Sequence, residues 1–244
     1  MRKRSKGAGL KKSREIGYNR YILRRKQQTA RRGENHMAVK FLKVFAGAVL
    51  AGISIGLGGL VFLSVDDRVI GAALFTVGLF TVCTFGLNLF TGKVCYVFQN
   101  DGSYAAALPV IWLGNLAGTG LTALCASLTR NAPALAEKAA GLCRTKQDDS
   151  LLSLFFLGIL CNIFIYIAVE GYNRNQHEAG KYLSLLFGVM VFILCGTEHC
   201  VADMFYIWMA GAWSGRMILI ILVITLGNAA GGVLFPLMRQ YQNS

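Results

Sequence analysis

Six apolar segments, each long enough to cross a lipid bilayer as a helix, occupy most of the chain. About 20 consecutive apolar residues suffice for one crossing. The segments lie at about 39–65, 69–98, 104–128, 151–171, 181–210 and 217–238. Of the 244 residues, 55% are hydrophobic and only 15% are charged. The pattern predicts an all-α integral membrane protein whose six transmembrane helices lie within residues 38–244, and it argues against a soluble enzyme.

The positive charge is concentrated before the first segment, where residues 1–36 contain thirteen Lys or Arg and two Glu. We interpret residues 1–37 as a basic cytoplasmic tail, because basic residues beside a span stay on the cytoplasmic side. Six crossings then place both termini there, in an inner or plasma membrane. Three interpretations of the tail stay open: a disordered segment, adhesion to anionic lipid, or an extension before Met37 that is not native. Nothing suggests nucleic-acid binding.

The cysteine and histidine patterns argue against a metal site, a cofactor or an enzyme. Seven cysteines are scattered without a C-x-x-C pair, so they are interpreted as packing residues. His36, His177 and His199 are far apart in the sequence, whereas a haem or metal site would need several ligands together. No signal peptide is expected either, because the first apolar segment is too long for one.

Two of the segments are interrupted at corresponding places. The second contains the polar stretch Asn-Leu-Phe-Thr-Gly at 88–92, and the fifth contains Gly-Thr-Glu-His-Cys at 196–200. The segment after each has the same opening, Gly-Asn-x-Ala-Gly, at 114–118 and 227–231. Three spans repeated after an odd number of crossings predict an inverted repeat of about 38–128 and 151–240, with broken second and fifth helices. The repeated glycines are interpreted as helix-packing positions.

Glu198 and His199 are the ionisable residues of the second interruption. Charged groups at membrane depth are costly and indicate a functional site by default. A buried histidine satisfied by its neighbours is the simpler explanation of His199 alone. Its place in one helix interruption opposite another favours a functional role, since irregular backbone at this depth must line a cavity or be buried in protein.

These motifs together resemble the formate/nitrite transporter family. The resemblance is carried by 88–92, by Cys161-Asn162, by 196–204 and by the two Gly-Asn helices, and it extends over about residues 40–240. It implies an aquaporin-like fold, a pore within each subunit and a homopentamer. It also implies passage of small monovalent anions such as formate, nitrite or hydrosulfide.

The resemblance also implies roles for individual residues. His199 matches the central pore histidine, and Thr91 matches the threonine of the loop that faces it. Asn162 and Glu198 match polar residues that support the histidine, and Lys146 matches an outer-loop lysine that attracts anions. The apolar constrictions are implied at Leu79, Leu89 and Phe90 on the inner side, and at Phe75, Ile165 and Phe192 on the outer side.

The chain departs from the family pattern at several polar positions. Many members carry an acid at Asn88, an aromatic residue at Thr197, serine at Cys200 and asparagine at Asp203, so the electrostatics around His199 are expected to differ. The stretch that ends in Lys93 is similar to the hydrosulfide-channel branch.

A proton-assisted mechanism accounts for this set of residues. An anion loses its hydration in an apolar constriction at a high cost, whereas its neutral acid does not. Lys146 is therefore expected to concentrate the anion, His199 to donate or share a proton, and Thr91 to orient the substrate. The main alternative is an aquaporin-like channel for small neutral solutes. Aquaporins carry paired Asn-Pro-Ala motifs, and the three prolines of this chain lie outside the interruptions.

Overall fold

The computed structural model describes residues 39–242, so the tail predicted for residues 1–37 lies outside the described part of the chain. The chain divides into two units, residues 1–43 and 44–244, and the description below concerns the second. Every regular element between residues 39 and 242 is a helix.

Four helices are long and apolar enough to cross a membrane. They are Val39–Ser64, α4 (Gly102–Ser127), α6 (Leu151–Arg174) and α9 (Gly215–Gln242). Each has 24 to 28 residues, more than the roughly 20 that one crossing requires. Large apolar side chains such as Leu113, Leu160 and Leu226 point out of these helices and are about half exposed, as expected where lipid replaces water. The protein is a multi-pass helical membrane protein.

The shorter helices occur as two similar pairs. The first pair is α2 (Arg68–Thr84) and α3 (Phe90–Val94), and the second is α7 (Glu178–Leu194) and α8 (Cys200–Ala210). Each pair is separated by five non-helical residues, 85–89 and 195–199. Each gap contains a glycine with positive φ, Gly86 at 62° and Gly196 at 67°. Only glycine adopts that conformation without steric cost, so these two residues allow the chain to leave one helix and begin the next.

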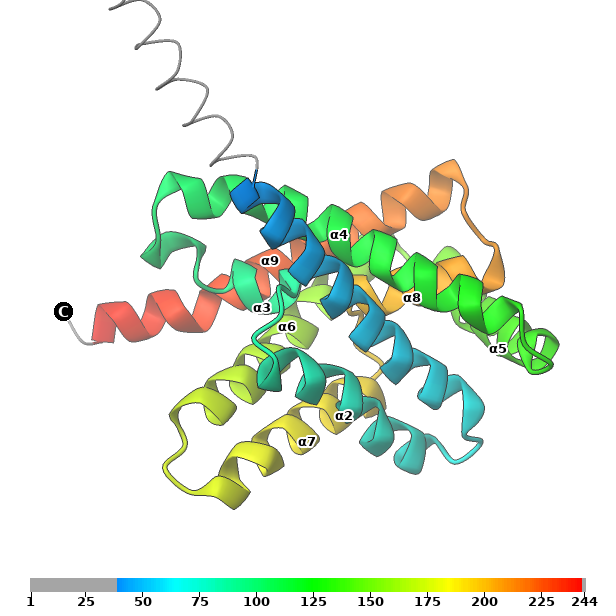
Figure 1. Cartoon of the computed structure of the whole chain (residues 1–244), viewed down its shortest axis with the longest axis horizontal. Coiled ribbons are helices and arrows are strands. Elements are labelled where there is room, and N and C mark those ends of the chain that lie inside the picture. Colours follow the sequence, from blue (N-terminus) through cyan, green and yellow to red (C-terminus); the bar gives the residue numbers. More distant parts are fainter. Residues whose placement is uncertain (1–38, 243–244) are drawn as a thin grey trace, which may run out of the picture. The chain divides into compact units, whose positions relative to one another are not determined.

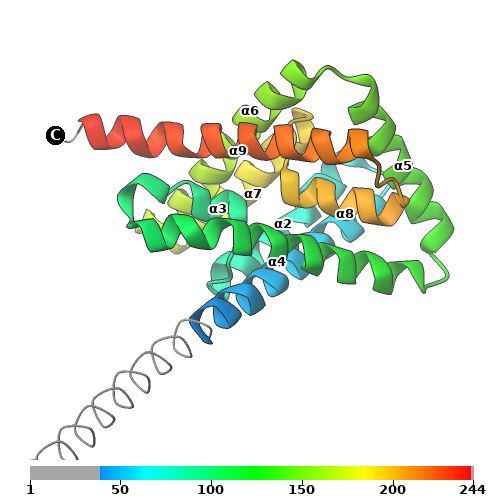
Figure 2. The ribbon, with the colours of Figure 1, turned by 90° about the horizontal axis from the view of Figure 1, so that it is seen from above.

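A last helix, α5 (Ala132–Asp148), joins α4 to α6, and a 3₁₀ turn at Val97–Gln99 precedes α4. Helix α6 packs against α9 and α7, and α2 packs against α7 (Figure 1). Helix α8 lies between α4 and α9, with α5 packed against it (Figure 2). The two short half-helices, α3 and α8, therefore begin inside the unit, where their first residues are buried.

The repeated glycines allow helix backbones to touch. A Cβ atom added to Gly118 would lie 2.1 Å from the carbonyl oxygen of Val49, and one added to Gly231 would lie 2.1 Å from that of Ile159. A side chain at either position would therefore force the two packed helices apart. The interpretation of these glycines as packing residues is confirmed.

One buried asparagine holds each helix interruption in place. Asn115 accepts a hydrogen bond from the Phe90 N–H and donates to the carbonyls of Ala48 and Asn88. Asn228 does the same in the other half: it accepts from the Cys200 N–H and donates to the carbonyls of Gly158 and Glu198. These six bonds measure 2.8–2.9 Å, and both asparagines are fully buried. The two halves thus fasten their interruptions with matching contacts.

Candidate functional site

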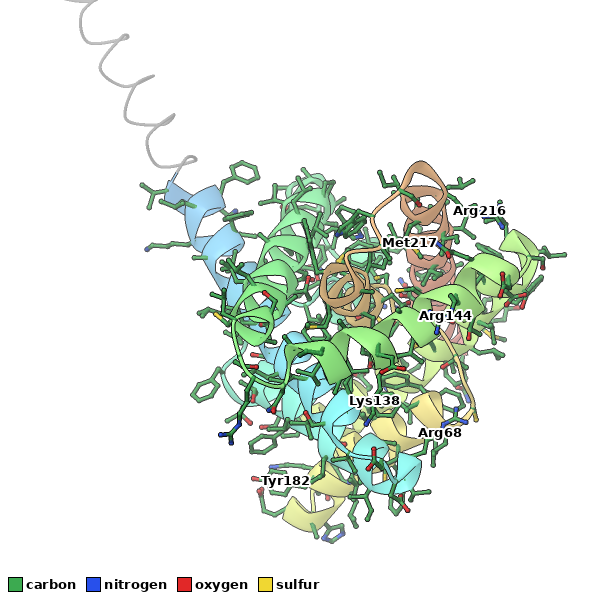
Figure 3. All side chains as sticks on the ribbon, turned by 90° about the vertical axis from the view of Figure 1, so that its right-hand side faces the viewer. Arg68, Lys138, Arg144, Tyr182, Arg216 and Met217 are labelled. Atoms are coloured by element: carbon green, nitrogen blue, oxygen red, sulfur yellow. The ribbon has the colours of Figure 1, made fainter. Side chains whose placement is uncertain are left out.

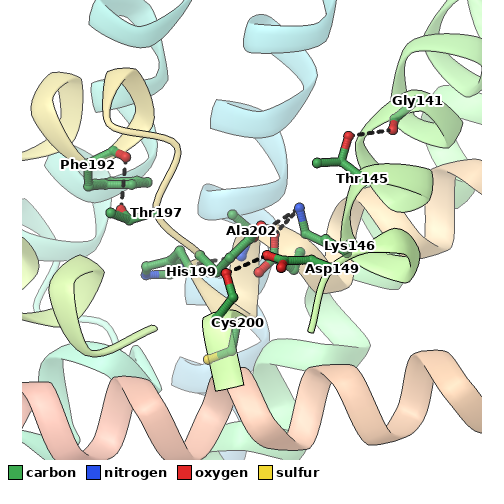
Figure 4. A network of polar contacts seen from close by, with 12 residues as sticks. Gly141, Thr145, Lys146, Asp149, Phe192, Thr197, His199, Cys200 and Ala202 are labelled. Atoms are coloured by element: carbon green, nitrogen blue, oxygen red, sulfur yellow. Dashed lines mark hydrogen bonds and ion pairs between the residues drawn. The ribbon is translucent and has the colours of Figure 1, made fainter. Parts of the chain in front are cut away.

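His199 is the last residue of the second interruption and the N-cap of α8. Its Nδ1 accepts a hydrogen bond of 3.1 Å from the Ala202 N–H (Figure 4). Its Nε2 lies 2.9 Å from the Thr91 hydroxyl on α3. Because Nδ1 is an acceptor, the neutral ring carries its proton on Nε2 and donates it to Thr91. The two interruptions therefore meet at one hydrogen bond, between residues that are 3% and 0% exposed.

Aromatic side chains surround this hydrogen bond on one side. Phe192, in the last turn of α7, stacks on the His199 ring with centroids 5.7 Å apart and an interplanar angle of 23°. Phe75 of α2 meets Phe192 edge-on at 6.0 Å. Ile165 of α6 is buried as well. Of the phenylalanines predicted for the outer constriction, Phe192 lies directly against the histidine and Phe75 lies against Phe192.

Two cavities approach this point from different sides. The α5-side cavity has a volume of about 480 Å³ and reaches Phe75, Phe192 and His199. The α3-side cavity has a volume of about 190 Å³ and reaches Leu79 and Leu89. Phe75 and Leu79 are one turn apart on α2, so a short buried apolar segment separates the two cavities.

Phe90, the third residue predicted for the inner constriction, is buried but belongs to the lining of neither cavity. Its backbone N–H is held by Asn115. The structure therefore places Leu79 and Leu89, and not Phe90, at the end of the α3-side cavity. Lys93 lines that cavity together with Tyr96 and Tyr104.

Lys146 lies in a different environment from the outer loop in which it was predicted. The connection at 129–150 folds as the helix α5, and Lys146 belongs to its buried face with Leu135, Ala139 and Cys143. This spacing of three or four residues is that of one helix side. The side chain is 6% exposed, and Nζ lies 2.9 Å from Oε2 of Glu198 and 3.3 Å from Oδ1 of Asp203.

The two carboxylates determine the protonation of Lys146. Burial by itself lowers the pKa of the ammonium group, but the charges of Asp203 and Glu198 raise it more, and the resulting pKa lies above the usual value. Lys146 is therefore a positive charge already compensated within the protein. The expected loop location is corrected, because Lys146 lies on the buried face of a helix and pairs with two carboxylates; its attraction of anions stays a prediction.

Glu198 and Asn162 were predicted to support the histidine, and neither appears among the hydrogen bonds of the ring within residues 39–242. Glu198 instead pairs with Lys146. Asn162 donates to the carbonyl of Thr91 at 3.1 Å and to that of Asn228 at 2.7 Å. Asn162 therefore positions the threonine that faces the histidine, and its support of His199 is indirect.

The structure adds two residues that sequence reasoning did not place in the site. Asp203 stands one turn after His199 on α8 and lines the α5-side cavity; the only sequence signal was its departure from the asparagine of the family pattern. Arg68, at the start of α2, also lines this cavity and donates from Nη2 to the carbonyls of Ile193 (3.1 Å) and Leu194 (3.4 Å). A lone arginine at the beginning of an apolar segment gave no indication of this position.

Basic residues surround the α5 side of the protein. Arg68, Lys138, Arg144 and Arg216 all lie on this face (Figure 3). Lys138 forms an exposed ion pair of 2.8 Å with Asp66, and its hydrogen bond and charge lower the pKa of that carboxyl group. Arg68 makes its described contacts with backbone carbonyls, which leave its full charge at the α5-side cavity.

Comparison with known proteins agrees with this geometry. The family described as formate/nitrite transporter matches residues 25–241. The chain is 30% identical over 218 residues to the nitrite transporter NirC of Salmonella typhimurium, covering 80% of each chain. It is 32% identical over 184 residues to the uncharacterized transporter YrhG of Bacillus subtilis, covering 69% of each.

Solved structures show the same fold. A structure described as an FNT family ion channel superposes with a TM-score of 0.73 at 26% identity, over 85% of this chain and 92% of that one. A pentameric formate channel with formate bound superposes with a TM-score of 0.72 at 24% identity, over 84% and 97%. Because the family model matches most of the chain, residues 25–241, the chain belongs to the formate/nitrite transporter family.

Proposed function

We propose that the protein is a channel or transporter for small monovalent weak-acid anions, with formate, nitrite and hydrosulfide as the candidate substrates. One observation carries the proposal. The two helix interruptions meet in the hydrogen bond between His199 and Thr91, at the barrier that separates the two cavities. Membership of a family of transporters, and likeness to relatives named for nitrite and formate, support the same reading.

The barrier explains why protonation matters. A small anion that leaves the α5-side cavity must pass Phe75, Phe192 and the leucines beyond them without its hydration shell. A dehydrated charge in an apolar medium costs many kcal/mol more than the neutral acid. Passage as the neutral acid, with the proton released on the far side, avoids this cost. His199 assists at the narrow point, where it is the polar group beside the phenylalanines.

The hydrogen-bond geometry defines what His199 and Thr91 contribute. The imidazole is held by Ala202 and donates its Nε2 proton to the Thr91 oxygen. The threonine hydroxyl hydrogen is then free to donate to a substrate oxygen or sulfur. The pair therefore presents an oriented donor in the barrier, which favours a molecule with a lone pair and orients it for passage.

The arrangement in the membrane follows from the helices. We propose six crossings, in which α2 with α3 forms the broken second and α7 with α8 the broken fifth, and in which the two halves are inverted. Both termini then lie in the cytoplasm, the α5-side cavity opens outward and the α3-side cavity inward, in an inner or plasma membrane. We also propose a homopentamer with one pore in each subunit, as in the pentameric formate channel whose fold is similar.

Flux into proteoliposomes tests the proposal. Purified protein is reconstituted, and uptake of formate, nitrite and hydrosulfide is measured at two pH values, with water permeability measured in parallel. His199→Asn is the informative variant, because asparagine is itself a good N-cap and can accept from Ala202 while the imidazole is removed. Thr91→Val removes the hydroxyl and keeps the shape of the side chain.

Both variants are expected to reduce anion flux, and His199→Asn is expected to change its pH dependence. Unchanged rate and pH dependence in His199→Asn would contradict a role of the histidine in protonation. Water permeability without anion flux in the wild type would instead support an aquaporin-like channel for neutral solutes.

A further inference from the structure

Two carboxyl groups share one ammonium group at the edge of the α5-side cavity. Lys146 comes from α5, Glu198 from the second interruption and Asp203 from α8, and their side chains are only 3–10% exposed. With all three ionised, the cluster would carry a net charge of −1. An uncompensated charge in a buried site costs several kcal/mol, and here it would also stand in the path proposed for anions.

The contacts of Asp203 are incomplete. Its Oδ1 faces Lys146, but its Oδ2 is buried and has no hydrogen-bond partner among the described residues. The carboxyl groups of Glu198 and Asp203 contact the same ammonium nitrogen, at 2.9 Å and 3.3 Å, so two negative charges would lie close together in a buried site. A proton on either carboxyl group removes the excess charge and its repulsion.

Within residues 39–242, the elements packed around the pair bring no second cation into contact with it. The other titratable groups that face Asp203 come from three helices, and all are neutral or weakly acidic: Cys143 on α5, Cys161 on α6, and His199, Cys200 and Tyr206 on or beside α8. Arg68 lines the same cavity but makes its described bonds with carbonyls of α7. Within residues 39–242, Lys146 is the cation in contact with the two carboxyl groups.

We propose that Asp203 and Glu198 hold one proton between them in the resting protein and deliver it to the anion in the α5-side cavity. Both residues line that cavity, so the proton is within reach of a bound anion. In the transfer, the carboxyl O–H bond breaks, its electron pair stays on the carboxylate, and the anion gains the proton and becomes the neutral acid. The carboxylate then takes a new proton from the solution that fills the cavity.

In this assignment, the carboxyl pair supplies the proton and the barrier residues orient the neutral acid. His199 has one ring nitrogen occupied by the Ala202 N–H and the other directed at Thr91, so it orients the neutral acid without being the first donor. With the proton on the pair, the cluster is neutral and Arg68 leaves the cavity with a net positive charge. The cavity then attracts the anion and provides the proton that anion needs.

Infrared spectroscopy of the full-length protein in lipid tests the shared proton directly. At about pH 8, exposed carboxyl groups are ionised, so a protonated-carboxyl C=O band reports a buried acid. We expect this band in the wild type and expect its loss in Asp203→Asn and in Glu198→Gln, because either change leaves a one-to-one ion pair with Lys146. Asp148→Asn is the matched control, because Asp148 is exposed and lies on α5, the helix of Lys146. This variant should keep the band.

Anion uptake is the second measurement. Its interpretation rests on the proposed function. At about pH 8, proton-coupled anion uptake in Asp203→Asn is expected to fall at least about tenfold, the lower range for loss of a positioned acid. At acidic pH, where solution supplies the neutral acid, uptake should approach that of the wild type.

Absence of the infrared band in the wild type, or its persistence in both carboxyl variants, would overturn the shared proton. A wild-type pH profile in Asp203→Asn would overturn the delivery of that proton. If the wild type transports no anion at any pH, the proposed function fails, and the infrared result still decides the shared proton. Should one variant fail to fold, the other and the wild-type band decide it.

Discussion

Asn228→Ala is expected to loosen the interruption that carries His199. The side chain makes three hydrogen bonds of 2.8–2.9 Å, and alanine removes all of them. Two of the partners, the Glu198 carbonyl in the non-helical turn and the N–H of Cys200, the first residue of α8, are left without a bond. A buried backbone group without a partner costs about 1–3 kcal/mol. The Gly158 carbonyl lies within α6 and loses only an additional bond, worth about 0.6 kcal/mol in membrane proteins.

The expected loss of stability is therefore about 3–7 kcal/mol. It is measured as the free energy of unfolding in detergent, together with anion flux in proteoliposomes. Asn115→Ala, which breaks the corresponding bonds of the other half, should have a similar effect. Thr119→Ala is the matched control, since this buried hydroxyl bonds only a carbonyl of its own helix. If Asn228→Ala destabilises no more than Thr119→Ala, the asparagine does not hold the interruption.

Three further outcomes follow from the structure. Gly231→Ala pushes a Cβ into the Ile159 carbonyl at 2.1 Å and should lower the unfolding free energy by about 1–3 kcal/mol, whereas Gly215→Ala, which meets nothing within 4 Å, should not. Thr91→Val should lower anion flux about tenfold or more in stopped-flow assays, since an oriented donor is lost, with little change in thermal stability. Phe192→Ala removes the ring stacked on His199 and should raise the permeability to water relative to formate; an unchanged ratio would argue against Phe192 as part of the barrier.

The elements that sequence reasoning could predict are those set by local pattern. Apolar segments of about 20 residues indicate membrane helices, because a helix satisfies its own backbone groups within the segment and a membrane strand needs only about 10 residues. The stretches at 88–92 and 196–200 stood out because polar residues and glycine interrupt such segments, and the structure begins α3 and α8 within them. The Gly-Asn repeat likewise indicated close helix contact, and the glycines do meet neighbouring backbone.

Residues whose role depends on a distant partner could not be assigned in this way. Lys146 was read as a loop lysine because its connection is polar; the helical face that buries it becomes visible only when α5 packs on α8. Arg68 and Asp203 reach one cavity from α2 and α8, which are far apart in the chain. Asn162 was expected to support the histidine, and its hydrogen bond to the Thr91 carbonyl, which makes that support indirect, could not be read from the sequence.

The sequence by itself determined the helical membrane class, the two interruptions and the candidate histidine, because hydropathy and glycine act over a few neighbouring residues. Only the tertiary structure decided which charges face each other. Electrostatic energy depends on distances in space and on burial, and the 2.9 Å and 3.3 Å contacts of Lys146 join three elements that the sequence keeps apart. Those contacts turn a lysine predicted to capture anions into the centre of a buried ion cluster.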